Sequence, residues 1–154
     1  PTMSEALYKG LLGAGYNMNT EGGVLVTVRD TDKEEIVEIA RSYYELGFKM
    51  YATHGNADVL EAAGIRTTRV DKIADNPVSN TMTLIESGKV QYIISTSAKG
   101  RNPLRDSVKI RLKSVELGIP CLTSLDTAKS LAKILKCNYK VEDVSLVDIC
   151  TLQK

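Results

Sequence analysis

Five short apolar runs, rich in β-branched residues, recur along the chain and are separated by stretches with helical spacing. The predicted strands cover residues 24–28, 48–52, 67–70, 90–95 and 119–122. The run Val24–Val28 hardly alternates between apolar and polar positions, which is typical of a strand covered on both faces. Strands alternating with helices in this way predict an α/β fold, in which a five-stranded parallel sheet is flanked by helices in three layers.

The stretches between the predicted strands place apolar residues three or four positions apart, as amphipathic helices do. The first such helix is expected over residues 32–46, and shorter ones over 57–63 and 81–86. Two later helices are expected to bury these stripes: Leu104, Val108, Leu112 and Val115 in one, and Ala128, Leu131, Ala132 and Leu135 in the other. Residues 141–149 are expected to add an edge strand.

The first eighteen residues have a different pattern. Thr2 and Glu5 have the spacing of a capping box, which predicts a short helix that is followed by a linker up to about residue 23. A helix this short cannot bury its own apolar face. Residues 1–22 are therefore expected to be the terminal helix and linker of a preceding domain, and residues 23–154 the main domain. The start at Pro1 fits a fragment or a processed product.

Net charge, apolar content and cysteine spacing disfavour several classes of function. The chain has 154 residues and a net charge of +1, so it has no overall positive field for nucleic acid, and an anion site must be local. No apolar stretch approaches the length of a membrane span. The three cysteines lie far apart, which disfavours a disulfide framework or a metal site and favours a reducing cytoplasm. No membrane partner, resident metal or cofactor is expected.

Candidate binding residues follow the strands, because ligands of open parallel sheets bind at the carboxyl ends of the strands. Lys33 lies in the first turn of the helix after the first strand, where a cation opposes the helix dipole unless an anion binds there. A solvated lysine explains the position equally well. Lys72 follows the third strand and adds a second cation at the same edge.

Two loops add hydroxyl groups to this edge. Thr53-His54-Gly55-Asn56 follows the second strand and combines a hydroxyl, a permissive glycine and exposed N–H groups. His54 has no carboxylate partner that spacing can assign, so a hydrogen-bonded loop histidine is expected rather than a general base. Residues 95–97 add three consecutive hydroxyls after the fourth strand. Together these loops predict a phosphorylated ligand, although the chain has neither a P-loop nor a dinucleotide fingerprint.

Five segments of the sequence resemble those of a known family. They are Gly23-Val-Leu-Val-Thr-Val-Arg-Asp-Thr-Asp-Lys33, Tyr51-Ala-Thr-His-Gly55, Val70-Asp-Lys72, Tyr92-Ile-Ile-Ser-Thr-Ser97 and Arg105-Asp-Ser107. Over roughly residues 22–149 the chain resembles the methylglyoxal-synthase-like domain that ends the large chain of carbamoyl phosphate synthetase. The resemblance implies a methylglyoxal-synthase-like sheet with flavodoxin-like winding.

The resemblance also implies an allosteric role. The domain would bind a nucleotide effector of the UMP or IMP type and regulate carbamoyl phosphate synthesis for pyrimidine and arginine biosynthesis. The residues expected to hold the effector's phosphate are Lys33, Thr53, Lys72 and Thr96. Those expected to approach the phosphate, ribose or base are Thr27, Asn56, Ser95, Ser97 and Asp106. The parent enzyme would use ATP and a divalent metal elsewhere, and the partners would be the rest of the large chain and a glutaminase small subunit.

Two enzyme families share the implied fold. Methylglyoxal synthase carries a G-G-D-Q run with its catalytic base and a Pro-His-Asp-Pro motif, whereas this chain has Ala74-Asp-Asn-Pro-Val-Ser-Asn80 and Pro103-Leu-Arg-Asp106. The K-T-L-H-P motif of IMP cyclohydrolase is also missing. No catalytic residue is therefore expected in this domain. The alternative is a methylglyoxal-synthase-like phosphate lyase that acts on a small phosphorylated metabolite.

Overall fold

The computed structural model describes residues 2–96 and 106–138. In this part of the chain, five parallel strands form one sheet. They are β1 Gly23–Thr27, β2 Lys49–Thr53, β3 Thr67–Val70, β4 Val90–Ser95 and β5 Cys121–Leu122. The five predicted strands and the α/β class are confirmed to within a few residues. The edge strand expected over 141–149 lies outside the described residues.

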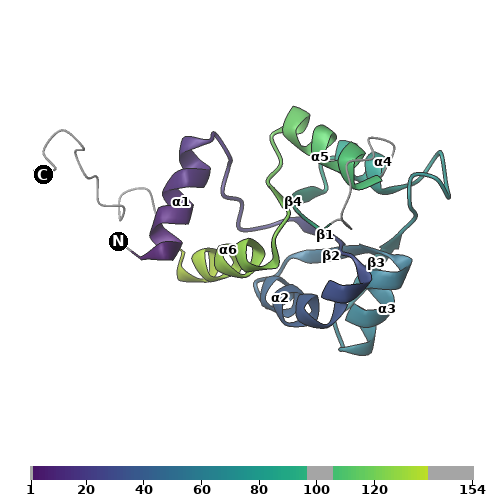
Figure 1. Ribbon diagram of the computed structural model, residues 1–154, viewed down its shortest axis with the longest axis horizontal. Coiled ribbons are helices and arrows are strands. Elements are labelled where there is room, and N and C mark those ends of the chain that lie inside the picture. The colour runs from purple at the N-terminus through teal and green to yellow at the C-terminus, as the bar shows by residue number, and fades with distance from the viewer. Residues whose placement is uncertain (1, 97–105, 139–154) are drawn as a thin grey trace, which may run out of the picture.

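Helices cover both faces of the sheet (Figure 1). They are α1 Met3–Gly13, α2 Lys33–Glu45, α3 His54–Ala62, α4 Thr81–Glu86, α5 Asp106–Leu117 and α6 Leu125–Cys137, with a 3-10 turn, η1, over Asp30–Asp32. The larger core cluster joins α1, α2, α3 and α6 to one face through residues such as Val24 and Leu131. The smaller cluster joins α4 and α5 to the other face, around Leu25 and Ile93. The chain therefore forms three layers, as expected.

The strand order is β3-β2-β1-β4-β5. The chain winds outward from β1 through β2 to β3 and then returns to place β4 beside β1, so the switch point lies between β1 and β4. A flavodoxin-like order would place the third strand there, and this detail of the expected winding is wrong. The reason is burial: β3 has no buried residue, which suits an edge, whereas β4 carries fully buried Tyr92, Ile93 and Ile94 and suits the centre.

Helix α1 packs against α6 and shares the larger core cluster. Thr2 caps the helix by accepting a hydrogen bond from the backbone N–H of Glu5 at 3.1 Å. Tyr8 is 5% exposed, and the segment after the helix is tied to β4 because the hydroxyl of Tyr92 donates to the carbonyl of Asn19 at 2.7 Å. The terminal helix thus buries its apolar face within the described chain. Its origin in a preceding domain stays a prediction.

Helix α5 is turned relative to the predicted stripe. Ile110 and Ser114 are buried, whereas Leu112 and Val115 are 68% and 67% exposed; Leu104 lies outside the described residues. This helix has two faces with apolar residues at helical spacing, and the face that packs on the sheet contains the small Ser114. The hydroxyl of Ser114 donates to the carbonyl of Arg111 at 2.7 Å. By contrast, all four residues of the stripe predicted for α6 are buried. Within residues 2–96 and 106–138, no helix is long and apolar enough to span a membrane.

Candidate functional site

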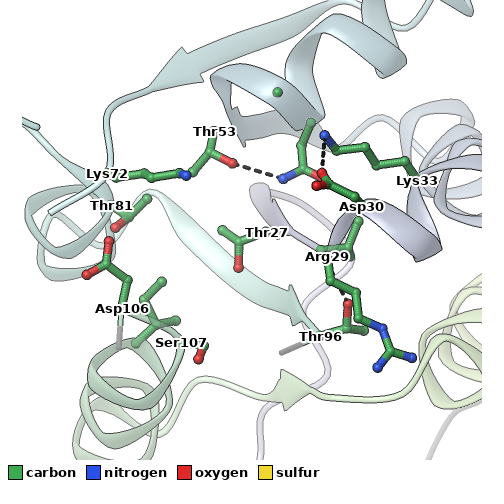
Figure 2. A pocket seen from close by; sticks show the side chains of 14 residues that line it. Thr27, Arg29, Asp30, Lys33, Thr53, Lys72, Thr81, Thr96, Asp106 and Ser107 are labelled. Atoms are coloured by element: carbon green, nitrogen blue, oxygen red, sulfur yellow. Dashed lines mark hydrogen bonds and ion pairs between the residues drawn. The ribbon is translucent and has the colours of Figure 1, made fainter. Parts of the chain in front are cut away.

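A cavity of about 390 Å³ opens at the carboxyl edge of the sheet, beside the β1–β4 switch point (Figure 2). Its volume falls within the range of small-molecule sites, about 300–1,000 Å³. Segments that follow β1, β2, β3 and β4 meet there with the start of α5. The lining residues are Thr27, Val28, Arg29, Asp30, Lys33, Thr53, Gly55, Asn56, Lys72, Thr81, Thr96, Asp106, Ser107 and Ile110.

Two lysines from different loops give the cavity a cationic wall. Lys33 is the first residue of α2, and its Nζ lies 2.6 Å from Oδ1 of Asp30. Lys72 reaches in from the loop after β3, and Thr53 lines the same cavity (Figure 2). The hydrogen bond and charge of Lys33, and more weakly the charge of Lys72, hold the pKa of Asp30 below its usual value. Two cations beside one carboxylate leave a local positive excess that attracts an anion.

The start of α3 adds hydrogen-bond donors to this wall. Thr53 is the N-cap of α3 but makes no side-chain bond to the helix backbone; instead its Oγ1 accepts from Nδ2 of Asn56 at 2.9 Å. The N–H groups of a first helical turn have no partner within the helix, so they are available to an anion. A Cβ on Gly55 would lie 3.1 Å from Nζ of Lys33, so the ammonium stands directly over this turn.

On the β4 side, hydroxyl groups link the two strands of the switch point. The hydroxyl of Thr27 donates to that of Ser95 at 3.0 Å, and the backbone N–H of Arg29 donates to Oγ1 of Thr96 at 3.1 Å. Ser95 itself does not line the cavity but holds Thr27 in place. Burial raises the pKa of Asp32, but hydrogen bonds from Thr96 and Arg29 outweigh it, and the net pKa is lowered.

Two buried side-chain atoms at the cavity have no hydrogen-bond partner among the described residues. They are Oδ1 of Asn56 and Oγ1 of Thr81, on side chains that are 5% and 1% exposed. A buried polar atom without a partner costs about 1–3 kcal/mol, and such atoms are rare in folded proteins. Both residues line the same cavity, so a molecule in the cavity is one source of the missing partners.

Beside the cavity, His54 has a carboxylate partner that the sequence did not reveal. Its Nε2 lies 2.7 Å from Oδ1 of Asp71, and Oδ2 of Asp71 accepts from Nδ2 of Asn76 at 3.1 Å. Hydrogen bonds from His54 and Asn76 lower the pKa of Asp71. Neither His54 nor Asp71 lines the cavity. The pair therefore ties the end of β2 to the loop after β3 rather than supplying a base to the cavity.

The structure brings together most of the candidate residues. The predicted residues that line the cavity are Thr27, Lys33, Thr53, Asn56, Lys72, Thr96 and Asp106. Ser95 supports Thr27 from outside, and Ser97 lies outside the described residues. Their role in binding stays a prediction. Sequence reasoning missed Asp30, Thr81 and Ser107; only Asp30 left a signal, because it lies three residues before Lys33. Among the described residues, no group of three or more His, Cys, Asp or Glu side chains is placed to hold a metal ion.

Comparison with known proteins adds a family and a fold. A family model described as MGS-like domain matches residues 35–123, more than half of the 154 residues. Among solved structures, the chain is similar to the crystal structure of a methylglyoxal synthase from Elizabethkingia anophelis NUHP1. The two share 13% sequence identity with a TM-score of 0.57, over 73% of this chain and 78% of that chain. At this identity the likeness concerns the fold alone.

Proposed function

The chain belongs to the MGS-like domain family, and we propose that it is the effector-binding domain of a carbamoyl phosphate synthetase large chain. The effector would be a nucleoside monophosphate of the UMP or IMP type. One observation carries the proposal: a single cavity gathers two lysines, a first helical turn without a side-chain cap and two unpartnered polar atoms. A phosphate ester with a polar organic part matches these groups better than an uncharged metabolite does.

The phosphate would bind between Lys33 and Lys72, against the start of α3. Its oxygens would accept bonds from both ammonium groups, from the hydroxyl of Thr53 and from first-turn N–H groups, and would displace Asp30 from Lys33. Charge-assisted bonds of this kind are roughly twice as strong as neutral ones. The organic part would extend toward Thr27 and Asp106, on the β1 and α5 sides of the cavity.

In this proposal the domain performs no chemistry of its own. The synthetic part of the large chain would use ATP and a divalent metal, and a glutaminase small subunit would supply ammonia. Effector binding would change synthesis through coupling between sites, which is typically worth about 1–3 kcal/mol. The products would serve pyrimidine and arginine biosynthesis.

A second candidate is a methylglyoxal-synthase-like phosphate lyase, and one observation favours it. Asp106 lines the same cavity, where a carboxylate near a bound phosphate ester could remove a proton. Two features favour the regulatory role instead. The other carboxylate of the cavity, Asp30, is paired with Lys33, and the loop 74–80 lacks the G-G-D-Q run of that enzyme.

The first test is calorimetric titration of the chain with UMP and with IMP, for wild type and for Lys72→Ala. Losing a charge-assisted bond of about 1.5–3 kcal/mol should weaken binding about 10- to 150-fold. Lys133→Ala, an exposed lysine on α6 away from the cavity, is the matched control and should bind like wild type. Wild-type affinity in Lys72→Ala would contradict the proposed site.

An activity assay separates the two candidates. The chain is incubated with dihydroxyacetone phosphate, and released phosphate is measured. We expect no release above background. Phosphate elimination that Asp106→Asn abolishes would replace the regulatory proposal with the lyase.

A further inference from the structure

The hydroxyl of Thr81 has no structural task in the described fold. The capping bonds of α4 are made by Asn80, whose side chain accepts from the N–H groups of Met82 and Thr83 and whose own N–H is bound by Oγ1 of Thr83. The backbone N–H of Thr81 donates to the carbonyl of Asp71 at 3.0 Å, which fixes its position. Its Oγ1 is buried in the cavity wall with no partner.

The carboxamide of Asn56 likewise has one atom, Oδ1, without a hydrogen-bond partner. Its Nδ2 donates to Oγ1 of Thr53 at 2.9 Å, which orients the group and leaves Oδ1 as a buried acceptor. An amide oxygen can only accept hydrogen bonds, so the missing partner must be a donor. The phosphate group of a fully ionised monoester carries no P–OH and offers no donor, so the phosphate of such an ester cannot satisfy this atom.

We propose that Thr81 and Asn56 form a specificity element that reads the organic part of the ligand beside its phosphate. The ligand class is then an organic phosphate monoester that carries a hydroxyl or N–H donor within reach of the phosphate. Inorganic phosphate and phosphate esters without such a group would fill the cationic wall and make no contact with these two atoms. The inference deepens the proposed function and rests on it for the nucleotide, but the same element would serve a sugar phosphate.

The division of the cavity supports this assignment. The two lysines, Lys33 and Lys72, come from α2 and from the loop after β3. Thr81 and Asp106 come from the α4 and α5 layer, on the other side of the sheet from α2 and α3. Asp106 adds a carboxylate that, like Asn56 Oδ1, only accepts hydrogen bonds. The α4 and α5 side of the cavity thus suits a group rich in donors, whereas Asn56 adds its acceptor from α3, beside the cationic wall.

The test compares Thr81→Val with wild type, using inorganic phosphate, ribose 5-phosphate and UMP as probes in calorimetric titration. Valine keeps the shape of threonine and removes the unpartnered hydroxyl, so the melting temperature should not fall. Affinity for the organic probes should fall about 3- to 10-fold, while affinity for inorganic phosphate should not change. Thr81→Ser keeps the hydroxyl and should retain the affinity for both organic probes.

A matched control lies two residues along the same helix. The hydroxyl of Thr83 is fully used within the capping box, since it accepts from the N–H and donates to the carbonyl of Asn80 at 2.9 Å each. Thr83→Val should therefore lower the melting temperature and leave affinity unchanged. Thr81 would then differ from Thr83 in both readouts, which a merely structural role does not explain.

The outcomes separate this inference from the proposed function. Binding of ribose 5-phosphate but not of UMP, with a loss in Thr81→Val, would retain the inference and reject the nucleotide. Equal losses for all three probes in Thr81→Val would overturn the inference, because the hydroxyl would then act on the phosphate or on the fold. It would also be overturned if no organic probe bound wild type more tightly than inorganic phosphate does.

Discussion

Replacing Gly55 by alanine should change stability and binding in opposite directions. Gly55 is the second residue of α3 and does not have the positive φ that favours glycine, so an alanine fits its backbone. Alanine is favoured over glycine inside helices by about 0.5–1 kcal/mol. For a chain of this size that raises the melting temperature by roughly 1–4 °C. The added Cβ costs little, because the atom it meets is the mobile end of Lys33, 3.1 Å away.

Binding should suffer because the same methyl group enters the space between the Lys33 ammonium and the first turn of α3. A phosphate that loses one charge-assisted bond there loses about 1.5–3 kcal/mol, which is about 10- to 150-fold in affinity. Calorimetric titration with UMP and a thermal melt on the same sample measure both effects.

Gly10→Ala is the matched control for this prediction. Gly10 lies inside α1, and a Cβ there would meet nothing within 4 Å. The change should therefore raise the melting temperature and leave affinity unchanged. If Gly55→Ala binds UMP as wild type does, the ligand does not use the space beside Lys33, and the proposed phosphate position is refuted.

Two further predictions concern charge and core packing. Asp30→Asn should strengthen UMP binding a few-fold in low salt and less in high salt, because it removes an exposed carboxylate that competes for Lys33; unchanged affinity at both salt concentrations would contradict this. Ile110→Ala should lower the free energy of unfolding by about 2–5 kcal/mol in urea titrations, whereas Leu112→Gln should change it by less than about 0.5 kcal/mol. Equal effects of the two α5 changes would refute the observed rotation of that helix.

Strands and most helices were predictable because their local pattern and their tertiary environment agree. The buried run Val24–Val28 and the single stripe of α6 each admit one arrangement. Helix α5 was not predictable, because Val108, Leu112 and Val115 form as good a stripe as the one that is buried. The order of the strands also depends on which strand is polar enough to lie at the edge of the sheet. That is decided by comparing the burial of all the strands, and no single strand reveals it.

The candidate site shows the same division. Residues at the ends of strands were predictable, because parallel strands bring their carboxyl ends to one edge. The pairing of His54 with Asp71 depends on β2 and β3 lying side by side with Thr53 opposite Val70, which no spacing in the chain reveals. Thr81 was missed because a threonine at the start of a short helix has the pattern of a cap. Only the structure shows that Asn80 makes those bonds and leaves Thr81 unused.

Through the hydroxyl of Tyr92, β4 connects the segment after α1 with the wall of the cavity. Tyr92 is bonded to Asn19 in the segment between α1 and β1, and Ser95, the last residue of the same strand, supports Thr27 in the cavity wall. The three-residue step from Tyr92 to Ser95 spans about 10 Å of extended chain, which can hardly lengthen further. We therefore expect a displacement of the segment that leads to α1 to reach the wall of the cavity through β4. A ligand that fixes Thr27 in the cavity wall should likewise restrain the segment that leads to α1.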